Sequence, residues 1–247
     1  MTETAIEFTT QQARKRINLS SAWWAVVSRF LLHGLIVSTW VSRIPAIQTS
    51  LGLTNAHLGL CLLGTAVGSV IAIPLTGWLV ARYGSKQATA WSTVGFSVAL
   101  IAPALAVSAE TLFASLILFG AMAGANDVAI NAQGVAIEKA SSSPTMSRFH
   151  AMFSIGGMIG ASLGGLAAAR NIAPQLHLAA ASVLFIITSL GTAPFLFEAC
   201  DNRRERSQAP RFSRIPPVLF TLAVIGFCMF LSEEQLPTGL AFISSKT

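Results

Sequence analysis

The run Phe119-Gly-Ala-Met-Ala-Gly-Ala-Asn-Asp-Val-Ala-Ile-Asn-Ala-Gln-Gly-Val-Ala-Ile-Glu138 places polar side chains inside an otherwise apolar, small-residue stretch. The polar residues are Asn126, Asp127, Asn131 and Gln133. Asp127 and Asn131 are four residues apart and Glu138 follows seven later, so a helix would stack all three along one side. A carboxylate at mid-bilayer costs about 2.5–3.5 kcal/mol and normally faces a bundle interior or a water-filled path. The run therefore predicts a membrane helix that forms the inner wall of a pathway.

The composition predicts an all-α polytopic membrane protein. Hydrophobic residues make up 53% of the chain and charged residues only 11%, whereas a soluble domain carries about 25% charged residues. The net charge of +6 would suit a nucleic-acid partner, but the basic residues lie in short clusters between apolar runs. That pattern indicates membrane topology, so we expect a lipid bilayer as partner and no nucleic acid.

A span needs about 20 mostly apolar residues, and the chain offers six full candidates and a seventh. The candidates are Ala22–Val41, His57–Val80, Ala88–Val107, Leu112–Ile137, Phe153–Ala169, Leu176–Phe197 and Val218–Leu231. We expect residues 1–20 to form a cytoplasmic N-terminus and residues 21–198 to form a six-helix half. A basic cytoplasmic linker over 199–217, a seventh helix over 218–232 and an aberrant tail over 233–247 would follow.

The basic residues predict the orientation. With the N-terminus in the cytoplasm, twelve of the sixteen fall on the cytoplasmic side, which is the positive-inside pattern. The twelve are Arg14, Lys15, Arg16, Arg82, Lys86, Lys139, Arg148, Arg203, Arg204, Arg206, Arg211 and Arg214. Trp23, Trp24 and Trp40 stand near span ends, where tryptophans commonly anchor a helix at the interface; for Trp40, a place in the lining of the outer vestibule is the alternative.

The segment Gly77-Trp-Leu-Val-Ala-Arg-Tyr-Gly-Ser-Lys86 stands between the second and third spans. At Gly77, Arg82, Gly84 and Lys86 it resembles the loop signature Gly-x-x-x-Asp-Arg-x-Gly-Arg-Lys of the major facilitator superfamily. It departs from that signature at Ala81, where the family usually has an acid, and at Ser85, where it has a second basic residue. The acid helps to hold neighbouring helices together in the family, so this resemblance implies a weaker contact here. An ordinary basic loop is the alternative interpretation.

A wider pattern is similar to a bacterial branch of the same superfamily, near the fucose-permease-like and rhizopine-transport-like members. It comprises Trp40–Pro45, Leu58–Leu60, Asn126–Gly134 with Glu138, and His150–Gly157. The resemblance covers about residues 20–232. It implies two six-helix halves, a central site for a small polar solute and proton or gradient coupling in the bacterial inner membrane. A sugar-like solute rests on this analogy alone.

Arg29 and His33 are four residues apart in the first span and share a face. We expect both to line the pathway, with Asp127 as their carboxylate partner; a structural ion pair, or an arginine that reaches to the cytoplasmic edge, is the alternative. Desolvation favours a neutral carboxyl and a nearby arginine favours a charged one. Asp127 is therefore the candidate for proton coupling, unless it is a packing residue satisfied by Asn131.

Glu138 and His150 lie near the inner ends of their helices, where a cytoplasmic gate and solvated helix ends are both reasonable interpretations. Glycines recur every four residues at Gly64 and Gly68 in the second span and at Gly156, Gly160 and Gly164 in the fifth. Small residues at this spacing let membrane helices approach closely. We expect them to pack helices within one bundle, with dimerisation as the alternative.

The family resemblance stops after Glu233, where relatives of this branch commonly continue with Glu-Gly-Ala-x-x-Asp-Trp. A different reading frame of suitably chosen codons for residues 233–247 restores such a continuation. We therefore expect a truncated or frameshifted transporter that lacks most of its second half and does not transport alone.

Two other classes of function compete with a transporter. A non-transporting membrane scaffold or sensor would retain the six-helix half. An intramembrane enzyme would need a paired-aspartate, Ser/Lys or metal-ligand arrangement, and the sequence has none at suitable spacing. No enzymatic activity, metal or cofactor is expected.

Overall fold

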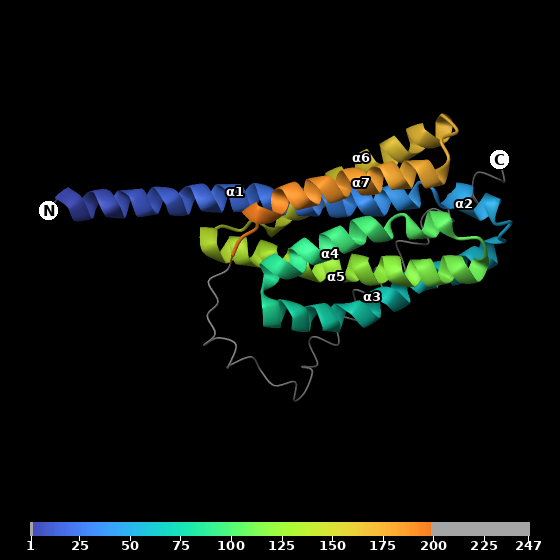
Figure 1. Ribbon diagram of the computed structural model, residues 1–247, viewed down its shortest axis with the longest axis horizontal. Helices are drawn as coiled ribbons and strands as arrows, with labels where there is room; N and C mark the ends of the chain where they lie inside the picture. Colours follow the sequence, from blue (N-terminus) through green and yellow to red (C-terminus); the bar gives the residue numbers. More distant parts are fainter. Residues whose placement is uncertain (1, 199–247) are drawn as a thin grey trace, which may run out of the picture. The chain divides into compact units, whose positions relative to one another are not determined.

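The computed structural model describes residues 2–198, with side chains described from residue 19 onward. The expected linker, seventh helix and tail lie outside the described residues. The described elements are α1 (Thr2–Val41), α2 (Ile44–Ser50), α3 (Asn55–Tyr83), α4 (Ser85–Ala99), η1 (Ala102–Leu105), α5 (Ala109–Ser141), α6 (Met146–Ala169), α7 (Pro174–Thr192) and η2 (Ala193–Phe195). Figure 1 shows these helices running alongside one another.

Within the described residues, six helical segments are long and apolar enough to cross a membrane. They are Leu19–Ser50, Asn55–Tyr83, Ser85–Leu105, Ala109–Ser141, Met146–Ala169 and Pro174–Phe195. The prediction of an all-α chain with six spans up to residue 198 is confirmed. Most of the helices reach further than the hydropathy windows, because polar residues at helix ends continue the backbone pattern without adding apolar character.

Two parts of the helix layout differ from the prediction. The helix α1 begins at Thr2, since residues 2–20 contain neither glycine nor proline and nothing in the sequence stops a helix there. The short helix α2 was not expected. Pro45 lies in its first turn, where a proline is tolerated, and the same residue disfavours continuation of the helix before it.

The turns between spans have local causes. The Thr54 hydroxyl accepts the His57 backbone N–H at the start of α3. Ser108 and Thr111 form a reciprocal capping box at the start of α5, which satisfies otherwise unpaired donors. Gly84 separates α3 from α4 with φ +88°, a conformation that favours glycine. This last turn carries the loop motif.

Glycines allow two pairs of helices to touch backbone to backbone. In the α1–α6 pair, a Cβ on Gly34 would overlap the carbonyl oxygen of Phe153, and one on Gly156 would overlap that of Leu31. In the α3–α5 pair, a Cβ on Gly120 would overlap the carbonyl oxygen of Thr65. Gly64, Gly68 and Gly160 make similar approaches, and a Cβ on Gly164 would overlap the Ser42 side chain. The prediction that these glycines pack one bundle is confirmed.

Large apolar side chains fill the space between the paired helices. Phe96 and Phe119 lie at 5.0 Å between ring centroids, and Trp40 packs on Phe119 at 6.0 Å. Trp40 is buried, so the expectation that it anchors the interface is wrong: its span continues into α2, which carries Trp40 away from the end. Trp24 is exposed, as an interfacial residue would be.

Candidate functional site

An exposed carboxylate lies midway along α5. Asp127 is exposed, and the Asn131 side-chain amide donates to its backbone oxygen at 2.9 Å and to its Oδ1 at 3.1 Å. The pair therefore sits one turn apart on the same side of α5, as the four-residue spacing predicted. Much of the other exposed surface of the spans is formed by leucine, isoleucine and valine. A carboxylate and an amide stand out on such a surface.

His150 of α6 belongs to the same polar site. It is exposed and close enough to Asp127 for the charges to interact. Its ring meets Phe30 of α1 edge-on, at 5.3 Å between centroids and an interplanar angle of 75°. Phe30 in turn stacks on Phe149 at 5.4 Å. Two helices, α5 and α6, thus contribute to one exposed site, which we call the polar face: Asp127, Asn131 and His150.

His33 and Asn126 lie inside the bundle instead. Both are buried, and the Asn126 side chain hydrogen-bonds the Nδ1 atom of His33 at 2.8 Å. The other end of the Asn126 amide meets the hydroxyls of Ser92 and Thr93 at 3.2 and 2.7 Å. The network therefore links α1, α5 and α4. Its buried polar groups are paired, as burial requires.

Arg29 does not meet Asp127. Its guanidinium donates to the hydroxyl of Ser189 and, through Nη2 at 2.6 Å, to the Ser189 backbone oxygen. Among residues 19–198 no carboxylate pairs with Arg29. The expected contact between these two residues is wrong, because Ser189 offers two acceptors to the guanidinium and lies in the last turn of α7, where the helix dipole attracts a cation.

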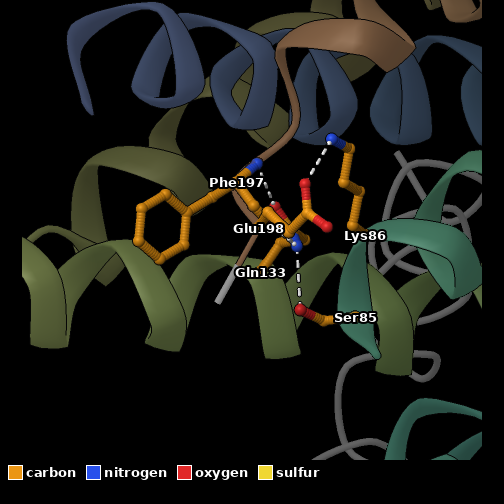
Figure 2. Close-up of polar contacts among 5 residues, drawn as sticks. All are labelled: Ser85, Lys86, Gln133, Phe197 and Glu198. Atoms are coloured by element: carbon orange, nitrogen blue, oxygen red, sulfur yellow. Dashed lines mark hydrogen bonds and ion pairs between the residues drawn. The ribbon is translucent and has the colours of Figure 1, made fainter. Parts of the chain in front are cut away.

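Gln133 links three elements at one end of the bundle (Figure 2). Its Nε2 donates to the Ser85 hydroxyl at 2.8 Å and to the Phe197 carbonyl at 2.9 Å, and its Oε1 accepts the Phe197 N–H at 3.1 Å. The side chain is fully buried. Gln133 therefore holds the start of α4 and the segment after α7 against α5.

The loop motif lies at this same end. Lys86 and Glu198 form an ion pair at 3.3 Å, also drawn in Figure 2. The Arg82 guanidinium lies over the rings of Trp78 and Tyr83, at 5.5 and 5.6 Å from their centroids. Gly77 is exposed and faces open space. Ser85, a departure from the family signature, is one of the two residues that Gln133 binds.

Glu138 closes the turn between α5 and α6. One oxygen of its carboxylate accepts the backbone N–H groups of Thr145 and Met146 at 2.7 and 2.9 Å. These donors belong to the start of α6 and have no partner within the helix. Among the described contacts Glu138 thus acts as a helix cap.

Sequence reasoning found the polar run but not its division into two faces. Asn126 and Gln133 are seven residues apart and share the buried face of α5, whereas Asp127 and Asn131 share the exposed one. That seven-residue spacing was the available signal for Gln133. No local sequence pattern marked the importance of Ser189, Ser85 and Glu198, because each contacts a partner that is distant in the sequence.

The comparisons with known proteins agree with this architecture. The family model described as Major Facilitator Superfamily matches residues 23–245. An uncharacterized transporter of Sinorhizobium fredii is 35% identical over 159 residues, which are 64% of this chain and 42% of the relative. An uncharacterized MFS-type transporter of Yersinia pestis is 34% identical over 209 residues, 84% of this chain and 53% of the relative. Membrane protein MosC of Rhizobium meliloti is 30% identical over 173 residues, 70% of this chain and 41% of the relative.

The chain spans about half the length of the curated relatives it matches. The family match covers nearly the whole chain and reaches all six described spans. The resemblance inferred from the loop motif and the polar run is therefore confirmed, and with it a multi-pass membrane protein of a non-enzymatic class. The chain belongs to the major facilitator superfamily of membrane transporters.

Proposed function

We propose that this chain supplies one wall of a secondary transporter that moves a small polar solute by alternating access, coupled to protons. The observation that carries the proposal is the polar face, Asp127, Asn131 and His150, which interrupts an apolar exposed surface. In transporters of this kind the substrate site lies near the bilayer midplane, between two halves that rock against each other. An exposed carboxylate at that depth is a functional-site candidate by default.

Asp127 and His150 suit proton coupling. A protonated imidazole stabilises the charged form of a neighbouring carboxylate, and loss of its proton removes that effect. The departure of water from the site destabilises the charged form. Closing the cavity on either side would change both conditions. We assign Asp127 the proton-binding role and His150 the role of its charge partner, in place of Arg29.

The polar face also suits a hydroxyl-rich solute. The Asn131 amide and the Asp127 carboxylate together offer hydrogen-bond donors and acceptors, and the His150 ring, backed by the buried Phe30 ring, adds a flat surface. Sugar-like polyols combine hydroxyls with apolar ring faces. His33 and Asn126, one layer further inside, would hold the supporting helices in position.

The membrane orientation is part of the proposal. The basic residues Arg82, Lys86, Lys139 and Arg148 all stand at alternate turns of the bundle, and alternate turns of antiparallel spans lie on one side. The positive-inside rule puts that side, and the N-terminus, in the cytoplasm. The bacterial relatives support the inner membrane as the location.

The test begins with ligand binding by the full chain. A panel of sugars, polyols and other small polar metabolites is screened by thermal shift on the purified protein and on Asp127→Asn. Glu110→Gln, which changes an exposed acid in the first turn of the same helix, is the matched control. A ligand that stabilises the wild type and the control but not Asp127→Asn supports the proposed site.

Coupling is then measured in vesicles as flux of that ligand with and without a proton gradient. Gradient-dependent flux that Asp127→Asn abolishes supports the transporter assignment. If no ligand binds and no gradient-dependent flux occurs in the chain or in an extended form with a second half, the scaffold or sensor alternative is favoured instead.

A further inference from the structure

A pocket of about 300 Å³ lies between α1 and the end of α7, away from the polar face. It is lined by Ser21, Trp24, Ala25, Thr192 and Phe195. The two aromatic side chains are exposed, Trp24 by 63% and Phe195 by 56%. The pocket therefore opens on the outer surface of the bundle, and none of its residues belongs to α5 or α6.

The structure explains why the pocket is there. Arg29 bonds to Ser189 and holds α1 against α7, one turn from Ala25 on α1 and one turn from Thr192 on α7. Beyond that contact α7 ends, and the chain turns through η2, which has a proline in its first turn. The turn η2 still packs on α1, with Leu196 buried in the same apolar cluster as Ala22 and Ala25. The side chain of Phe195 forms one wall of the pocket on the outer side.

The lining favours an acyl chain over a polar solute. Trp24, Ala25 and Phe195 provide apolar contacts, and only the hydroxyls of Ser21 and Thr192 are polar. No charged side chain lines the pocket. A bilayer surrounds the outer surface of such a bundle, so phospholipid is the ligand that this surface meets at the highest concentration. The ester oxygens of a phospholipid are acceptors for the Ser21 hydroxyl, whereas the Thr192 hydroxyl already donates to the Thr188 backbone oxygen at 2.8 Å.

The sequence of α1 next to the pocket adds a preference for charge. Arg14, Lys15 and Arg16 stand on α1 five to seven residues before Ser21, and no acidic residue lies between Phe8 and Ala25. A helix rises 1.5 Å per residue, which places these positions roughly 8–10 Å along the axis from Ser21. The headgroup layer of one leaflet is about 5–8 Å deep, so these positions lie at its outer edge when Ser21 stands at its inner edge. Basic clusters at this depth attract anionic lipids.

We propose that this pocket is a binding site for an anionic phospholipid. One acyl chain lies between Trp24 and Phe195, and the phosphate lies at the level of Arg14, Lys15 and Arg16. The lipid would fill the space between α1 and the end of α7. The proposal does not depend on transport activity, because the pocket shares no residue with the polar face.

The experiment compares lipids that differ only in their headgroup. The full chain is purified with phosphatidylglycerol and phosphatidylcholine of identical acyl chains, and the retained lipid is counted by native mass spectrometry. We expect phosphatidylglycerol to be retained about tenfold or more over phosphatidylcholine, a preference of the size that three basic residues near an anionic surface confer.

Two variants test the two parts of the site. Trp24→Ala with Phe195→Ala removes the walls of the pocket, and Arg14→Gln with Lys15→Gln and Arg16→Gln removes the basic cluster. Each should lose the preference. Trp91→Ala, an exposed tryptophan elsewhere on the bundle, and Arg148→Gln, an exposed basic residue on α6, are the matched controls and should keep it.

A second measurement does not depend on how the truncating variants fold. Phosphatidylglycerol with brominated acyl chains should quench the tryptophan fluorescence of the wild type more than that of Trp24→Phe. Equal quenching of the two proteins overturns the proposal. So does equal retention of the two lipids, or a preference that the pocket variant keeps and only the basic variant loses, which would indicate surface attraction without a pocket.

Discussion

Arg29 on α1 and Ser189 on α7 are joined by two hydrogen bonds although 160 residues separate them in the sequence. Both side chains are fully buried. The partner of this buried cation is the end of a helix and not an acid. The Ser189 carbonyl also accepts the backbone N–H of Ala193, so the guanidinium uses the second lone pair of this oxygen.

The Ser189→Ala variant tests the worth of this contact. It removes the hydroxyl acceptor and keeps the backbone acceptor, so we expect the free energy of unfolding to fall by about 1–2 kcal/mol. Thermal unfolding of the purified protein in detergent measures the change. Ser162→Ala, an exposed serine that bonds only to its own helix, should change stability by less than about 0.5 kcal/mol. Equal effects of the two variants would contradict the assigned role of Ser189.

The Gly120→Ala variant tests the close approach of α3 and α5. The new methyl group would overlap the carbonyl oxygen of Thr65, and a backbone group cannot move aside as a flexible side chain can. We expect a loss of roughly 1–3 kcal/mol, seen as a lower midpoint of thermal unfolding. Gly165→Ala is the control, because nothing lies within 4 Å of its added methyl group. A stable Gly120→Ala protein would show that the two helices can separate freely.

The Gln133→Leu variant tests the link at the end of the bundle. It keeps the size of the side chain but leaves the backbone N–H and C=O of Phe197 without their partner. We expect the free energy of unfolding to fall by about 1–3 kcal/mol, whereas Gln87→Leu, at an exposed position beside the same turn, should have little effect. Trypsin digestion supplies a second readout, since the chain just after Phe197 carries several arginines. Faster cleavage there in Gln133→Leu than in Gln87→Leu is the expected result.

Asn126 and Asn131 provide a matched pair on the two faces of α5. Asn126→Ala leaves His33 without its partner inside the bundle, so we expect a loss of about 1–3 kcal/mol in stability. Asn131→Ala should leave stability within about 0.5 kcal/mol and instead weaken the thermal shift produced by any ligand of the polar face. If both variants only destabilise the protein, Asn131 has a structural role and the proposed site loses a member.

The spans could be predicted from the sequence because burial in a bilayer requires a long apolar run, whatever the tertiary structure. The glycines at four-residue spacing predicted helix packing for a similar reason, since only small residues permit backbone contact. The polar run on α5 was found because polar groups are rare in membrane spans. Each of these signals is local.

The partners of the polar side chains could not be predicted in the same way. Arg29 and Asp127 are the obvious opposite charges in the sequence, yet Arg29 binds Ser189 and Asp127 lies near His150. To choose between these pairings, one must know how each helix is rotated about its own axis. An apolar run sets the length of a helix but only weakly sets its rotation when most of its faces are apolar. Ser85 and Phe197 escaped notice because one contributes a single hydroxyl and the other its backbone.

The glycine contacts restrict how the bundle can change shape. Where a glycine rests on a carbonyl oxygen, a slide of one residue along the axis would bring a larger side chain against the neighbouring backbone. The α1–α6 and α3–α5 pairs are thus each confined to a single register, and each pair must move as one rigid piece. Any conformational cycle of this bundle would have to use the joints between the pairs, where side chains and not backbones meet.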